Sequence, residues 1–209
     1  MSTKIAVCAC IFSCLAISSF GSAAAPIQLS VDLTDAPRKL LHARLTIPVE
    51  PGPVTLVYPQ WIPGEHGPTG PVGDLAGLVF TADGRTLGWR RDDVNMYAIH
   101  VDVPTGARML DVKLDFLATA PPTGFSAGAS TGANLAVLSW NELLLYPSGA
   151  TAASVIFEPT VTLPAGWHFG TALTRASSNG DASGRTSSGA GATRNSRSRK
   201  YRLCSGFHL

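Results

Sequence analysis

The segment Tyr58-Pro59-Gln60-Trp61-Ile62-Pro63-Gly64-Glu65-His66-Gly67-Pro68 constrains the fold more strongly than any other part of the chain. It follows a run of alternating apolar residues, and it contains two aromatic residues, three prolines and two glycines. Proline fixes the backbone angle φ and removes a hydrogen-bond donor, whereas glycine adopts φ values that other residues avoid. Neither an α-helix nor a central β-strand accommodates this composition. The segment therefore predicts a rigid, shaped loop at the end of a strand.

This loop has two interpretations. It is either a structural corner that packs Trp61 into the core, or a surface loop that faces a ligand or a neighbouring domain. We predict that Tyr58 is buried, that Trp61 is at least partly buried, and that Glu65 and His66 are exposed at the loop tip. The candidate interface or ligand residues of the loop are Trp61, Pro63, Gly64, Glu65 and His66.

The sequence before the loop alternates between apolar and polar residues. In residues 27–33, for example, the apolar residues Ile27, Leu29, Val31 and Leu33 share one face of a strand. Residues 41–49 and 54–58 continue the alternation after short turns that contain proline. These three runs predict a three-stranded meander with one buried face.

The sequence after the loop predicts further short strands. Residues 78–80 and 86–89 flank a tight turn at residues 82–85, and residues 97–103 and 110–116 form the clearest hairpin pattern. Additional strand-like runs are residues 135–138, 143–146, 154–157 and 161–163. Many short strands at a spacing of roughly ten residues, without an amphipathic helix of normal length, are typical of a sandwich. We therefore predict an all-β fold, an antiparallel β-sandwich over residues 25–174.

The first 24 residues have the pattern of a cleaved signal peptide. Lys4 precedes an apolar run from Ile5 to Phe20, and small residues at Ser22-Ala23-Ala24 predict cleavage before Ala25. We therefore expect a secreted or periplasmic protein without stable membrane insertion after cleavage. Three of the four cysteines lie in this segment, which leaves Cys204 alone in the mature chain and excludes an internal disulfide.

The residues from Arg175 to the end differ in composition from the rest. They carry seven Lys or Arg against one Asp and are dominated by small polar residues, so we expect residues 175–209 to be a disordered basic tail. The tail is either natural or the product of a reading frame lost near residue 180, and we favour the second origin because the composition changes abruptly. Residues 5–174 carry eight Lys or Arg against thirteen Asp or Glu, and this mildly acidic balance argues against a nucleic-acid partner.

A strand that ends in an aromatic residue and continues as Trp61-Ile62-Pro63-Gly64 resembles the N-terminal β-domain of the glycyl-aminopeptidase-like zinc metallopeptidases, metallopeptidase family sixty-one. The runs at residues 84–87 and 91–99 fit the next hairpin of that domain, and the resemblance covers about residues 27–174. In that family the β-domain precedes a thermolysin-like zinc domain and a PDZ domain. The resemblance implies a non-catalytic accessory domain, present without its catalytic partner domain, which would carry the zinc.

No residue set in the chain supports catalysis. The family's zinc site requires H-E-x-x-H, which places two histidines one helical turn apart, and the motif does not occur in these 209 residues. We therefore expect no cofactor in this chain and no enzyme activity from it alone.

The form of a nucleophile elbow occurs at Gly124-Phe125-Ser126-Ala127-Gly128, but its flanks favour neither the strand nor the helix that the elbow needs. His100 with Asp102, and Asp92 with Asp93, are interpreted as exposed polar residues.

A second candidate site lies at Trp140-Asn141-Glu142, between two strand-like runs. Trp140 is expected in the core and Asn141 in a turn where it satisfies backbone groups. The alternative is that Trp140 and Asn141 face the missing catalytic domain together with the Trp61 loop.

A different functional hypothesis is a stand-alone periplasmic β-sandwich that binds a sugar or a peptide through its glycine-rich loops. A third is a serine hydrolase that uses Ser126. The sequence does not determine the oligomeric state.

Overall fold

The computed structural model describes residues 25–62, 66–118, 129–151, 154–171, 173–175 and 199–204. Within these ranges the protein contains strands and three short 3-10 turns, and no α-helix. The strands are β1 (Ile27–Asp32), β2 (Leu40–Pro48), β3 (Gly52–Val57), β4 (Leu75–Ala82), β5 (Arg85–Leu87), β6 (Trp89–Arg91), β7 (Ala98–Val103), β8 (Met109–Leu117), β9 (Ser130–Thr131), β10 (Ala136–Val137), β11 (Tyr146–Pro147), β12 (Phe157–Leu163), β13 (Thr174–Arg175) and β14 (Arg199–Cys204). The 3-10 turns are η1 (Ala36–Arg38), η2 (Val72–Asp74) and η3 (Trp140–Leu143). The predicted all-β fold is confirmed.

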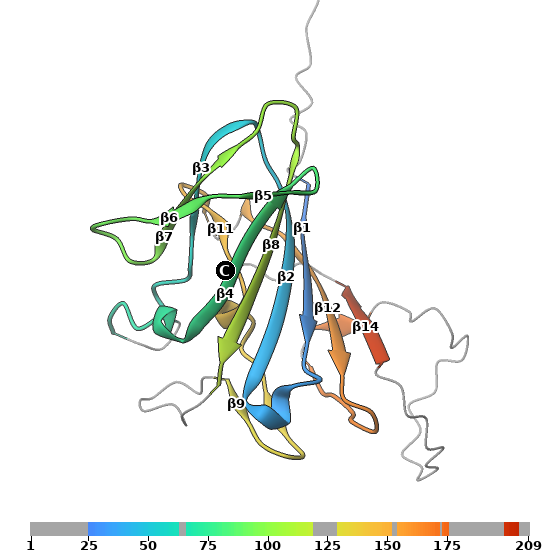
Figure 1. Ribbon diagram of the computed structural model, residues 1–209. Coiled ribbons are helices and arrows are strands. Elements are labelled where there is room, and N and C mark those ends of the chain that lie inside the picture. Colours follow the sequence, from blue (N-terminus) through green and yellow to red (C-terminus); the bar gives the residue numbers. More distant parts are fainter. Residues whose placement is uncertain are drawn as a thin grey trace, which may run out of the picture.

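Two sheets share one hydrophobic core. The larger sheet has the strand order β13-β14-β12-β1-β2-β8-β4-β5, and the smaller one has the order β11-β3-β7-β6. Strands β4, β8, β2, β1 and β12 run side by side in Figure 1, with the smaller sheet at the upper left. Strands β9 and β10 form a separate two-stranded pair. The sheets are mostly antiparallel, as predicted, and one pair, β1 with β12, is parallel.

The alternation of the sequence explains the core. In β2, the side chains of Leu41, Ala43, Leu45 and Ile47 are buried, and each lies opposite a buried residue of β8. The smaller sheet contributes Leu56, Ile99 and Val101 to the same hydrophobic cluster. Burial of one such large aliphatic side chain contributes about 1.5–3 kcal/mol relative to exposure. The shared cluster therefore stabilises the packing of the two sheets against each other.

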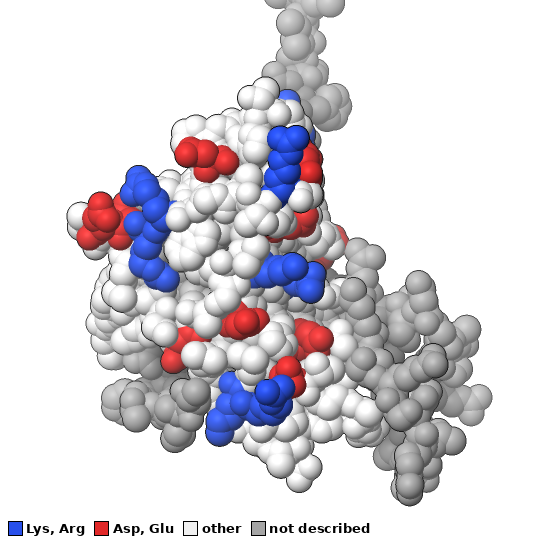
Figure 2. All heavy atoms as spheres, viewed as in Figure 1, with Lys and Arg blue, Asp and Glu red and all other residues white. Residues whose placement is uncertain are grey.

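The outer face of the larger sheet is polar. On β2 the outward residues His42, Arg44 and Thr46 lie opposite Asp115, Lys113 and Asp111 of β8, respectively. Figure 2 shows positive and negative side chains interspersed over this side of the molecule. The mixture of signs fits a solvated face, as expected for an antiparallel sheet that packs on one side only.

The predicted partners of several strands are wrong. Strand β3 pairs with β7 and β11 in the smaller sheet, so β1, β2 and β3 do not form a meander. Strands β7 and β8, predicted as a hairpin, belong to different sheets, and residues 104–108 carry the chain from one sheet to the other. The physical reason is that alternation identifies the buried face of a strand but not its neighbour. The tight turn between β4 and β5 is confirmed, because Asp83 and Gly84 adopt the positive φ values of 48° and 75° typical of such hairpins.

The predicted terminal segments are described only in part. The signal peptide at residues 1–24 and the tail residues 176–198 and 205–209 lie outside the described residues. Residues 199–204 form strand β14, which pairs with β12 and β13, so the expectation of disorder is wrong for this part of the tail. In the part of the chain that is described, no helix has the length and apolar character needed to cross a membrane.

Candidate functional site

The loop that follows β3 is fixed at its first residue by Tyr58. Its side chain is fully buried, as predicted, and its hydroxyl donates a hydrogen bond to the backbone oxygen of Glu142 at 3.1 Å. Its backbone N–H donates to the oxygen of Tyr97 at 2.9 Å. Burial, with a smaller contribution from the negative charge of Glu142, raises the pKa of Tyr58 well above its ordinary value. The hydroxyl therefore remains a donor, and it ties the loop to the η3 turn.

The far end of the loop is closed by backbone contacts. The Gly70 N–H donates to the oxygen of Gln60 at 3.0 Å, and the Tyr97 hydroxyl donates to the oxygen of Pro68 at 2.7 Å. A Cβ atom at Gly70 would lie 1.9 Å from the backbone oxygen of Pro59. Only glycine fits at this position, because any side chain would force the two backbone segments apart. These contacts therefore hold the described residues 58–62 and 66–70 close together, and we call residues 58–70 the Trp61 loop.

Trp61 points away from the core. Its side chain is 64% exposed, so the interpretation of Trp61 as a core residue is wrong. The fully buried Tyr58 occupies the core in its place, and the backbone bond between Gln60 and Gly70 closes the loop at Trp61. His66 is exposed, as predicted. The candidates Pro63, Gly64 and Glu65 lie outside the described residues.

The η3 turn contains a buried carboxylate, Glu142, for which the sequence predicted no role of its own. Glu142 is only 4% exposed, and its two carboxylate oxygens accept the N–H of Ala129 at 2.8 and 2.9 Å. Burial raises the pKa of Glu142, the Ala129 hydrogen bond lowers it, and nearby Asp74 raises it; the net direction is upward. The buried run Leu143 to Leu145 that follows was the available signal for its position.

Trp140 and Asn141 are half-buried in this turn. Trp140 packs against the core, in agreement with the prediction, while the side chain of Asn141 makes no hydrogen bond with any described residue, so its predicted role in satisfying backbone groups is not confirmed. Trp140 also lines a cavity of about 350 Å³. The other residues that line the cavity are Leu33, Leu135, Ala136, Val137, Leu138, Val161, Leu163, Trp167, His168, Phe169, Gly170 and Thr171. Trp61 does not line it, so the Trp61 loop and the η3 turn meet at the bond from Tyr58 to Glu142 but do not share this cavity.

The remaining polar candidates have structural partners. His100 contacts Asp92 at 2.8 Å and Thr55 at 2.9 Å, so its carboxylate partner is Asp92 rather than Asp102. Asp92 also accepts the N–H groups of Val94 and Asn95, which makes it a turn-building residue. Ser126 lies outside the described residues. The described ranges contain no group of three or more His, Cys, Asp or Glu residues that could hold a metal ion.

Comparison with known families gives a match over most of the chain. The Peptidase M61 N-terminal domain matches residues 28–187. The chain belongs to this family. The resemblance found at the Trp61 loop is therefore confirmed, and the matched region of the M61 domain extends beyond residue 174, where the strand pattern of the sequence fades.

A solved structure resembles the fold of this M61 domain. An aminopeptidase N family protein from Idiomarina loihiensis matches with a TM-score of 0.57 and 15% identity over 86% of the chain, and the match spans 29% of that protein. An M1 zinc metallopeptidase from Deinococcus radiodurans, bound to a Tyr-Ser-Ala substrate, matches with a TM-score of 0.43 and 13% identity over 86% of the chain and 38% of its own. The M61 domain thus spans less than a third of the first of these proteins. No curated protein matches the sequence.

Proposed function

We propose that this M61 domain is a non-catalytic accessory domain of a secreted glycyl-aminopeptidase-like zinc metallopeptidase. The observation that carries the proposal is the family match over residues 28–187. The catalytic domain would lie outside the 209 residues, which do not contain the H-E-x-x-H motif. The zinc would belong to that domain, and the chain alone would not cleave peptides.

The Trp61 loop is the proposed contact with the catalytic domain. Exposed aromatic residues contribute strongly to interfaces when they enter a pocket of the partner. Trp61 is 64% exposed, while Tyr58 and Gly70 hold the two ends of its loop in place. A loop that is already fixed loses little conformational entropy on docking, so more of its contact energy contributes to affinity.

The nucleotide sequence of the gene tests the proposed missing domain. We expect one of the three reading frames beyond codon 175 to encode a helix with H-E-x-x-H. If none of the three frames encodes this motif, the accessory role in a zinc metallopeptidase loses its support and the tail is natural. Secretion is tested separately by the intact mass of the exported protein, which should begin at Ala25.

A second function, ligand binding by the domain alone, is favoured by the cavity beside Trp140. Its volume of about 350 Å³ lies within the range of small-molecule sites, and two tryptophans and a phenylalanine line it. A sugar or a short peptide is the proposed ligand, because both stack on aromatic rings. Tryptophan fluorescence titrations with oligosaccharides and tripeptides test this function. Saturable binding that is lost in Trp167→Ala but kept in Trp89→Ala, a variant in the smaller sheet, would support it over the accessory role.

A further inference from the structure

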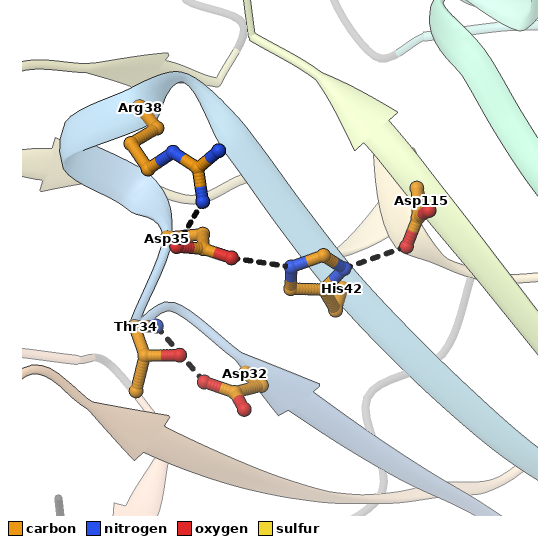
Figure 3. A network of polar contacts seen from close by, with 6 residues as sticks. All are labelled: Asp32, Thr34, Asp35, Arg38, His42 and Asp115. Carbon is orange, nitrogen blue, oxygen red and sulfur yellow. Dashed lines mark hydrogen bonds and ion pairs between the residues drawn. The ribbon is translucent and has the colours of Figure 1, made fainter.

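His42 lies on the outer face of the larger sheet, between two carboxylates that come from different elements. In the strand register, His42 on β2 lies opposite Asp115 on β8 and Asp32 on β1. Its ring lies between the side chains of Asp115 and of Asp35, which precedes the η1 turn (Figure 3). The Nδ1 atom is 2.6 Å from Asp115 and the Nε2 atom is 3.2 Å from Asp35.

Each of these contacts requires a proton on the ring nitrogen that makes it, Nδ1 for Asp115 and Nε2 for Asp35. An ionised carboxylate only accepts hydrogen bonds, and a neutral imidazole carries one N–H group. The contacts with Asp115 and Asp35 are therefore both satisfied only by the doubly protonated imidazolium. For the same reason His42 cannot activate a nucleophile in this arrangement, because neither ring nitrogen is available as a base.

His100 provides an internal comparison. Its Nε2 atom lies 2.8 Å from Asp92, and its Nδ1 atom lies 2.9 Å from the hydroxyl of Thr55. A hydroxyl can donate as well as accept, so a neutral His100 satisfies both contacts by donating to Asp92 and accepting from Thr55. The two histidines therefore differ in the protonation state that their partners require.

The elements around His42 bring charges of both signs. Asp35 also pairs with Arg38 at 3.3 Å, and His42 shares a depression of about 320 Å³ with Asp32, Arg44, Lys113 and Asp115. Burial lowers the pKa of His42, but its hydrogen bonds with Asp115 and Asp35 more than offset this, and the net direction is upward. The hydrogen bond from His42 is also the largest cause that lowers the pKa of Asp35.

Asp115 lies close to a bulge of strand β4. The β4–β8 register shifts between Ala76 and Val79, and Gly77 in this bulge has a φ of 61°. A Cβ atom at Gly77 would lie 2.5 Å from a carboxylate oxygen of Asp115. Only the absence of a side chain at Gly77 therefore leaves room for the carboxylate in this position.

We propose that Asp35, His42 and Asp115 form a pH-responsive clamp that fastens the η1 turn to the larger sheet. With His42 doubly protonated, the clamp joins η1 to β2 and β8. When His42 loses a proton, the longer contact to Asp35 opens first, and η1 is then held by its backbone hydrogen bonds and by the buried Ala36. Its neighbour Lys39 donates to the backbone oxygen of Thr131 in β9 at 3.0 Å, so the η1 region also contacts the β9–β10 pair.

The pH range in which the clamp is closed follows from the pKa shifts of Asp35 and His42. A histidine whose pKa rises on folding stabilises the fold below its unfolded pKa, and this stabilisation is lost as the pH rises through the folded pKa. A carboxylate whose pKa falls on folding stabilises the fold above its unfolded pKa, and the effect is lost as the pH falls through the folded pKa. The clamp is therefore closed between the lowered pKa of Asp35 and the raised pKa of His42.

NMR spectroscopy of the full chain tests the clamp. The ring signals of His42 and His100 are followed from about pH 5 to about pH 9, the range in which histidine titrates. Amide hydrogen exchange of Arg38 and Lys39, whose N–H groups bond to Asp35 and Ala36, reports on η1 after correction for the intrinsic effect of pH. We expect His42 to titrate above the ordinary histidine value, because its hydrogen bonds with Asp115 and Asp35 raise its pKa. Protection of the two amides should fall about two- to fivefold with the His42 titration, the scale of a partly exposed ion pair.

Two variants separate the clamp from general loss of structure. Asp35→Asn presents a side chain that satisfies neutral histidine, so the pH step in η1 protection should disappear while the protein remains folded. His100→Gln is the control and should leave the step unchanged. Titration of His42 at or below the ordinary histidine pKa of about 6.5 would overturn the proposal, as would a pH step that persists in Asp35→Asn.

Discussion

At the scale of single residues, Gly70 closes the Trp61 loop by its lack of a side chain. We predict that Gly70→Ala lowers the free energy of unfolding by about 1–3 kcal/mol, the cost of forcing extra atoms into a packed site. The added Cβ would lie 1.9 Å from the oxygen of Pro59. Gly73→Ala is the matched control, because a Cβ there meets nothing within 4 Å. Urea unfolding of the two variants measures the difference, and equal stabilities would contradict the close contact.

Tyr58 and Trp61 are three residues apart in the same loop but have opposite roles. We predict that Tyr58→Phe lowers the free energy of unfolding by about 1–3 kcal/mol, because the buried oxygen of Glu142 loses its donor. Trp61→Ala should cost less than about 1 kcal/mol, since its side chain is 64% exposed. Chemical denaturation monitored by circular dichroism compares the two. A larger cost for Trp61→Ala than for Tyr58→Phe would restore Trp61 as a core residue.

Single residues in the sequence predicted the structure correctly where only their near neighbours in the chain determine it. The end of strand β3 before the loop and the buried Tyr58 followed from proline, glycine and alternation around one strand. The exposure of Trp61 did not, because an aromatic residue in a loop serves equally well in a core or at an interface. The N–H of Ala129 donates to both carboxylate oxygens of Glu142, which lies 13 residues further along the chain. No periodicity in the sequence predicts this contact.

Among the structural elements, the η3 turn contains Glu142, whose contribution to the free energy of unfolding depends on pH. The pKa of Glu142 is raised by burial, so folding favours its protonated form, and its contribution to stability falls as the pH rises through the folded pKa. We predict that Glu142→Gln, which keeps an acceptor for Ala129 but carries no charge, gains stability relative to the wild type between about pH 4 and about pH 8.

Urea unfolding of the wild type and the variant at several pH values measures this difference. The His42 clamp is present in both proteins and cancels in the comparison. Glu50→Gln, at a side chain that is 82% exposed, controls for the removal of one acidic group. A relative stability of Glu142→Gln that decreases toward high pH would contradict the raised pKa.

Strand locations were predictable, but strand partners were not. The runs that became β1, β2, β7 and β8 alternate clearly, and their inward residues are buried. The runs at residues 154–157 and 161–163, predicted as separate strands, overlap the single strand β12, and most of the predicted strand at residues 143–146 lies outside any strand. Strands β7 and β8 resemble a hairpin because both alternate around a turn with proline and glycine, yet each pairs with other strands. A short turn between two strands can either reverse the chain within one sheet or lead to the opposite sheet. Only long-range packing distinguishes these outcomes.

At the scale of the whole molecule, the fold depends on contacts between the two ends of the domain. Strand β1 pairs in parallel with β12, as in the match of Ile27 with Phe157. A parallel pair needs a long connection, and here the strands from β2 to β11, which belong to both sheets, lie between β1 and β12 in the chain. Local sequence patterns contain no signal for such a pairing. The family match over residues 28–187 covers nearly all of β1 and the whole of β12.

We propose that this domain docks on a peptidase catalytic domain through the Trp61 loop. Calorimetric titration of the mature chain with a separately produced zinc catalytic domain of a glycyl-aminopeptidase-like peptidase tests it most directly. We predict saturable binding that weakens about tenfold or more in Trp61→Ala, the effect of removing an interface hot spot. Val94→Ala, at a residue 97% exposed on another loop, should bind like the wild type. Absence of binding by the wild-type chain, or equal affinity of Trp61→Ala and Val94→Ala, would contradict the account.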